Sequence, residues 1–91
     1  MHIDDVKKIK EPSRIADVYI KAIWYELHDN WDQAHIIVQD LSTMHAKWIH
    51  AYLHRKEGDI GNSKYWYRNA NKSYPGNIDF EEEIQTILND L

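Results

Sequence analysis

The amino-acid sequence predicts an all-α fold: two antiparallel helical hairpins stacked on each other, with a C-terminal helix that caps the stack. Three observations support this prediction. Apolar residues recur at steps of three and four, as on one face of a helix. Turn-forming residues divide the chain into segments of helical length, and the pattern of the first hairpin returns after 29 residues. Because 91 residues is the size of one domain, we expect residues 1–91 to form a single helical-repeat domain.

The first hairpin is predicted at about residues 13–41. Pro12 marks its start, and the sequence HDN at 28–30 divides it, because Asp and Asn favour turns and helix caps. Apolar residues within 3–9 indicate one further short helix before it. The stripes of the two hairpin helices consist of Ile15, Val18, Tyr19, Ala22, Ile23 and Leu27, and then of Ala34, Ile37, Val38 and Leu41, with the second helix starting near Trp31.

The second hairpin is predicted at about residues 44–74. Its first helix should begin at Met44, because Ser42 and Thr43 are good N-cap residues at the point where the apolar stripe changes phase. It should end at Glu57, since the following Gly58 can adopt the left-handed conformation that closes a helix.

The rest of the chain contains two more predicted helices. After a turn with the sequence GDIGN, a helix should run from Asn62 to about Ser73, because Pro75 cannot continue it. The final helix is predicted at about residues 79–90. Asp79 and Glu82 resemble a capping box at its start, and an apolar stripe follows. We expect this helix to cover the exposed apolar end of the stack.

Composition and charge exclude several classes of protein. The net charge is −4 and the chain has no base-reading motif, so nucleic-acid binding is not expected. There is no cysteine, which excludes disulfides and zinc sites with thiolate ligands. The N-terminal residues are charged, and no apolar run reaches the roughly 18 residues of a membrane span. These features predict a soluble cytoplasmic protein that binds no membrane.

The two hairpins are related as copies of one pattern. A shift of 29 residues aligns Ala22 with Ala51, and Ala34 with Ser63. The second copy resembles a tetratricopeptide repeat through its small residues, its turn, its aromatic residue and its closing proline: Ala51, Gly58, Asp59, Ser63, Tyr67, Ala70 and Pro75. It departs from that motif at Lys47 and His50, and the spacing is shorter than the usual length of about 34 residues. The string HAYLHRKEGD is also similar to small bacterial proteins of unassigned function.

The best chemical candidates lie on the predicted helix 44–57. His50, His54 and Glu57 follow at steps of four and three, so their side chains share one face. They could hold a metal ion, with His35 from the preceding helix as a further ligand. They could also act as an acid–base group, with the imidazole oriented by Glu57 and Arg55 binding an anion. Alternatively, the histidines form only a polar network between the hairpins.

Known catalytic motifs are absent. Ala51 stands where the H-E-x-x-H motif carries its general base, and no nucleophile elbow or phosphate loop is present. An enzyme is therefore the less favoured interpretation, and no cofactor is predicted.

Aromatic residues suggest a different kind of site. Trp48, Tyr52 and Arg55 follow one stripe, and the tetratricopeptide resemblance implies that this stripe, with His45, faces a concave groove. Trp, Tyr and Arg are enriched at binding hot spots, although helical spacing equally allows Trp48 and Tyr52 to be core residues. The adjacent residues 65–67 are Tyr, Trp and Tyr, which cannot all face one side of a helix. At least one of these rings, with Trp66 as a ligand-binding candidate, should be exposed or lie in a second interface.

These observations predict a small tetratricopeptide-like module for protein interaction or oligomerisation. Its partner would be another protein or a second copy of the chain, because the aromatic residues exceed what one hairpin pair usually buries. The alternative is a small protein or enzyme that binds a ligand or metal through His35, His50, His54, Arg55 and Glu57.

Overall fold

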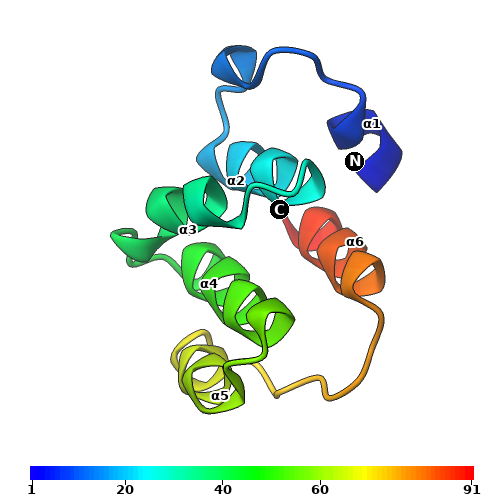
Figure 1. Ribbon diagram of the computed structural model, residues 1–91. Coiled ribbons are helices and arrows are strands. Elements are labelled where there is room, and N and C mark those ends of the chain that lie inside the picture. The colour runs from blue at the N-terminus through cyan, green and yellow to red at the C-terminus, as the bar shows by residue number, and fades with distance from the viewer.

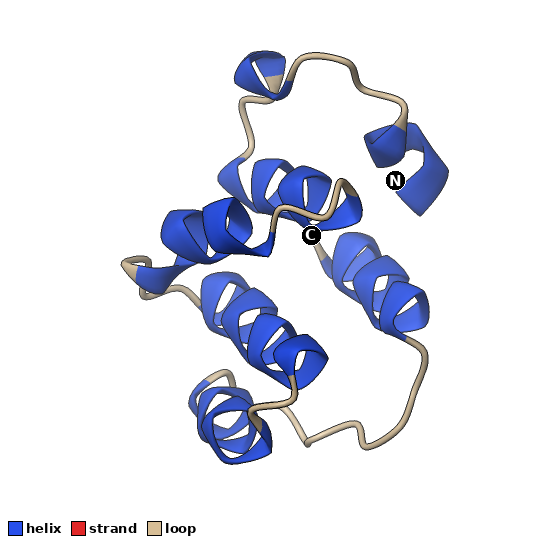
Figure 2. Ribbon diagram, viewed as in Figure 1, coloured by secondary structure: helices blue, strands red, loops and turns tan.

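The computed structural model describes residues 1–91 and confirms the all-α prediction, with six α-helices, one short 3₁₀ helix and no strand (Figures 1 and 2). None of the helices is long and apolar enough to cross a membrane. The elements are α1 (Ile3–Lys7), η1 (Pro12–Arg14), α2 (Val18–Leu27), α3 (Trp31–Gln39), α4 (Met44–Glu57), α5 (Ile60–Asn69) and α6 (Phe80–Asp90).

Side-chain caps set most of the helix starts. Each N-cap side chain accepts a hydrogen bond from a backbone N–H of the first turn, where the helix itself supplies no acceptor. At the other end of α4, Gly58 has φ +88°, the left-handed conformation expected from the sequence. The predicted bounds of α4 are therefore confirmed. The N-cap residues of α2 to α6 are Asp17, Asn30, Thr43, Asp59 and Asp79.

Three predicted boundaries were wrong. The helix after α4 begins at Ile60 rather than Asn62. Asp59 caps it, and Ile60, Gly61 and Asn62 form its first turn. It ends at Asn69, before the expected Ser73, and Asn71 then reverses the chain at φ +58°. Similarly, the first hairpin helix starts at Val18, since η1 and the Asp17 cap occupy the residues that precede it.

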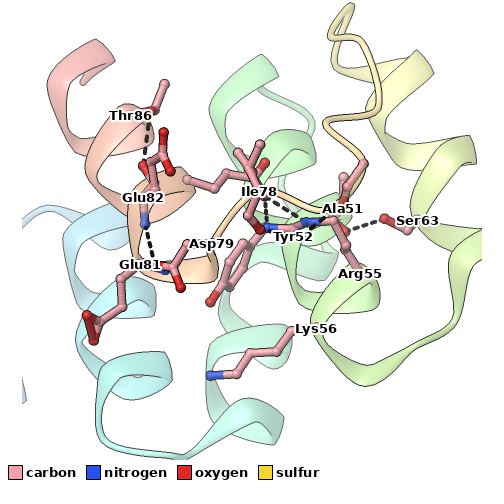
Figure 3. A network of polar contacts seen from close by, with 12 residues as sticks. Ala51, Tyr52, Arg55, Lys56, Ser63, Ile78, Asp79, Glu81, Glu82 and Thr86 are labelled. Atoms are coloured by element: carbon pink, nitrogen blue, oxygen red, sulfur yellow. Dashed lines mark hydrogen bonds and ion pairs between the residues drawn. The ribbon is translucent and has the colours of Figure 1, made fainter.

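The helices pair as two antiparallel hairpins, α2 with α3 and α4 with α5, which meet through α3 and α4. Small residues allow close approach within each hairpin: Ala22, Ala34, Ala51 and Ser63 are all fully buried. The Ser63 hydroxyl donates to the carbonyl of Ala51 at 2.8 Å, which joins α5 to α4 (Figure 3). Helix α4 is the centre of the fold, and nine of its 14 residues are buried.

Helix α6 returns along α4 on the side away from α5 (Figure 1). It runs antiparallel to α4, since Phe80 lies against Tyr52 and Asp90 bonds to His45. The short helix α1 packs against α6. The backbone N–H of Ile3 donates to the Gln85 side chain at 2.9 Å. The C-terminal helix thus covers the hairpins along the face of α4.

Candidate metal centre

Three histidines from two helices converge beside α4. His50 and His54 are one turn apart on α4, and packing of α3 brings His35 to them. The Nε2 atoms of His35 and His50 are 3.0 Å apart. One nitrogen from each of the three rings lies within 4.8 Å of the others. The structure therefore unites the three candidate histidines in one cluster.

Two indole rings stack on histidines of this cluster. Trp31 stacks on His35 with ring centroids 4.9 Å apart and planes 9° apart. Trp66, from α5, stacks on His50 at 4.0 Å and 21°. Because the Trp31 N–H also donates to the carbonyl of Leu53 at 2.7 Å, that ring is fixed to the backbone of α4. The imidazoles are consequently restricted in the directions they can face.

Glu57 contacts the cluster from outside. Its carboxylate lies 2.6 Å from His54 Nδ1, and since a carboxylate accepts hydrogen bonds, this contact places a proton on Nδ1. The lone pair of the neutral ring is then on Nε2, toward which Asn62 directs its amide nitrogen at 3.4 Å. In this arrangement Glu57 orients His54 and fixes its tautomer, rather than sharing the convergence point as the expected third ligand.

Burial favours the neutral forms of His35 and His50, because it lowers the pKa of both imidazoles. His50 is 5% exposed and His54 is 7% exposed. Burial, followed by repulsion from His35 and His54, lowers the pKa of His50 from 6.5 to about 4. The pKa of His35 is also lowered, first by burial and then by His54. A neutral imidazole has a nitrogen lone pair that can bind a metal without prior loss of a proton.

The geometry is close to that of a three-histidine metal site. Zn–N bonds of about 2.0–2.1 Å at tetrahedral angles hold ligand nitrogens about 3.3 Å apart. The His35–His50 separation of 3.0 Å is already near this value. The largest separation in the cluster is at most 4.8 Å, so movements of about 1–2 Å would complete the site.

Arg55 does not take part in this cluster. Its Nε donates to Glu83 Oε1 at 3.0 Å, and its Nη1 donates to the carbonyl of Gly76 at 3.3 Å. Nη1 also donates to the carbonyl of Ile78 at 3.0 Å (Figure 3). The guanidinium also lies over the Phe80 ring, 4.4 Å from its centroid. Arg55 is 6% exposed, and its donors serve the contact with α6 rather than an anion beside the histidines.

The other residues of the expected groove stripe also lie against α6. Trp48 and Tyr52 are 6% and 1% exposed, so both belong to the core. His45 Nε2 lies 2.9 Å from Asp90 near the end of α6. The C-terminal helix thus occupies the face that the tetratricopeptide resemblance assigned to a concave groove.

Two buried carboxylates complete the polar interior. Glu83 accepts from Trp48 Nε1 at 3.1 Å and from the Tyr67 hydroxyl at 2.6 Å, besides its ion pair with Arg55. Glu26 accepts from the Tyr52 hydroxyl at 2.7 Å. Burial, together with these carboxylates, raises the pKa of both tyrosines, so both hydroxyls stay protonated donors.

Sequence reasoning missed both carboxylates, although a signal existed. Glu83 is four residues before the buried Ile87, and Glu26 is four residues after the buried Ala22. Helical spacing therefore places each acid on the apolar face of its helix. A charge at such a position indicates a buried partner.

A surface depression of about 320 Å³ adjoins the histidine cluster. Trp31 and Glu57 line the depression and also contact the cluster, since Trp31 stacks on His35 and Glu57 contacts His54. Acidic groups dominate the lining, which consists of Glu26, Asp29, Trp31, Lys56 and Glu57.

In comparisons with protein-family models, with curated proteins and with solved structures, the chain has no match. The resemblance to tetratricopeptide repeats therefore stays a prediction. Function has to be inferred from the geometry of the site.

Proposed function

We propose that the protein binds a divalent transition-metal ion through His35, His50 and His54. The observation that supports this proposal is the convergence of three imidazole nitrogens within 4.8 Å from two separate helices. Glu57 has the role of a second-layer carboxylate: it accepts the Nδ1–H of His54 and thereby fixes the orientation and tautomer of that ring.

The donor set favours particular metals. Imidazole nitrogens suit zinc, copper, nickel and cobalt, whereas magnesium and calcium require oxygen ligands. Three protein ligands leave a coordination position for water or a small ligand, an arrangement typical of catalytic rather than structural zinc. Binding of a reactive ligand at that position is therefore part of the proposal.

Calorimetric titration of chelator-treated protein with Zn²⁺ tests the proposal. We expect one ion per chain, and a rise in stability of about 2.7 kcal/mol when free zinc reaches 100 times its dissociation constant. His50→Ala should abolish both effects. The matched control is His45→Ala, which removes a histidine of the same helix that bonds to Asp90 instead. Zinc binding that persists in His50→Ala, or disappears in His45→Ala, would contradict the proposed site.

A second candidate function is protein interaction or self-association. It is supported by large apolar side chains that are exposed on two helices: Ile36 of α3 is 54% exposed and Tyr65 of α5 is 52% exposed. Sedimentation velocity over a hundredfold range of protein concentration tests self-association. We expect a larger species in the wild-type chain, and its loss in Ile36→Ser with Tyr65→Ser. A concentration-independent monomer would count against self-association.

A further inference from the structure

We infer that the depression beside the histidine cluster is a binding site for an organic ammonium group, such as one end of a small amine. The inference concerns the residues between the α2–α3 turn and the end of α4, and it does not depend on a metal ion. It follows from the charge of the depression, from an unused buried oxygen and from an aromatic wall.

Charge gives the first argument. Three carboxylates and one ammonium line the depression, which leaves a net charge of −2. The ammonium of Lys56 is already paired with Glu26, at 2.7 Å from Oε2. Asp29 and Glu57 therefore remain as the carboxylates that a second cation would neutralise.

The buried carboxylate gives the second argument. Glu26 is only 3% exposed, yet it forms part of the lining. Its Oε2 accepts a hydrogen bond from the Tyr52 hydroxyl and is paired with the ammonium of Lys56. Its Oε1 forms no hydrogen bond within the chain. Oε1 is also absent from the fully enclosed polar atoms that lack a partner, so it is accessible from outside the protein. An accessible carboxylate oxygen of a lining residue that has no donor within the chain is an acceptor available to a ligand N–H.

The aromatic wall gives the third argument. Trp31 has one face stacked on His35, and this residue also lines the depression. An indole surface attracts cations and accommodates the CH₂ groups next to an ammonium. With a volume of about 320 Å³, the depression is at the small end of ligand sites. A small amine could neutralise the acidic groups, donate to the unused oxygen and lie against the indole ring at the same time.

The experiment uses 1,4-diaminobutane as the probe, added to chelator-treated full-length protein in about 150 mM salt to screen general attraction. Binding is followed by NMR through the indole N–H of Trp31, whose hydrogen bond to Leu53 keeps it fixed. We expect a saturable shift of that signal by the diamine and none by 1,4-butanediol, which has no charge. The absence of metal makes the outcome independent of the proposed metal site.

Variants locate the site. Asp29 has φ +61°, a conformation that Asn tolerates. Asp29→Asn therefore removes the charge alone, and we expect at least fivefold weaker diamine binding. Glu81→Gln removes an exposed acid of α6 and should change the affinity less than twofold. The inference is overturned if the Trp31 signal does not respond, if butanediol acts like the diamine, or if the two variants weaken binding equally.

Discussion

Helix α4 carries two buried polar clusters with opposite construction. Toward α6, the negative carboxylate of Glu83 meets the positive guanidinium of Arg55 and the donors of Trp48 and Tyr67. Toward α3 and α5, three imidazoles of the same chemical type face one another. The first cluster joins opposite charges and hydrogen-bond donors with acceptors, whereas the second contains three side chains of one type.

This difference separates a structural network from a candidate site. A buried charge is tolerated when opposite charge and hydrogen bonds compensate it, as around Glu83. In the histidine cluster, a neutral pair such as His35 and His50 shares only one proton between its two Nε2 atoms. A cation would occupy all the lone pairs at once. The charges on the α6 side thus compensate each other without a ligand, while the α3 side has lone pairs left for one.

The largest effect is expected on the compensated side. Glu83→Gln keeps the shape of the side chain but leaves the buried charge of Arg55 without its counter-ion, which should cost about 3–5 kcal/mol of unfolding free energy. Urea denaturation measures this loss. Glu82→Gln is the control, because Glu82 is the exposed neighbour on the same helix. Equal, small losses in both variants would mean that the Glu83 network is not a principal source of stability.

A smaller, pH-dependent effect is expected on the histidine side. The folded-state pKa of His50, about 4, is below the 6.5 of the unfolded chain, so the unfolded state binds the proton first as the pH falls. Stability from this group is complete above pH 6.5 and is lost between 6.5 and 4, by at most about 3 kcal/mol.

Denaturation of the metal-free protein at several pH values tests this effect. His50→Phe, which keeps a flat ring against Trp66, should have a shallower dependence on pH between 4 and 6.5. An identical slope in the variant and the wild type would assign the effect to other groups.

Local signals explain which parts of the fold the sequence predicted. The bounds of α4 follow from the Thr43 cap and from Gly58, which act on their own neighbours. The hairpin contacts follow from small residues such as Ala51 and Ser63, which form the close approach that joins α4 to α5. Helical spacing alone placed His50 and His54 on one face.

Contacts between residues far apart in the sequence explain the features that the sequence did not predict. An apolar stripe shows that α6 has a buried face, but it does not show which helix covers it. The burial of Arg55 depends on Glu83, 28 residues later, so helical periodicity within α4 could not indicate it. The contact of His35 with His50 likewise depends on how α3 packs on α4. The sequence could suggest His35 as a ligand, and only tertiary structure brings it there.

The smallest effect on stability is expected at Glu57, where a loss of metal binding should occur without a loss of stability. Glu57 is partly exposed, with 38% of its side chain accessible, so Glu57→Gln should change the unfolding free energy by about 1 kcal/mol or less. The same variant weakens the acceptor that orients His54, and loss of such a second-layer carboxylate typically lowers metal affinity by about 10- to 100-fold. Zinc titration and urea denaturation of one preparation measure both quantities. If Glu57→Gln lowered stability as much as Glu83→Gln while leaving zinc affinity unchanged, the histidine side would be a structural network like its counterpart under α6.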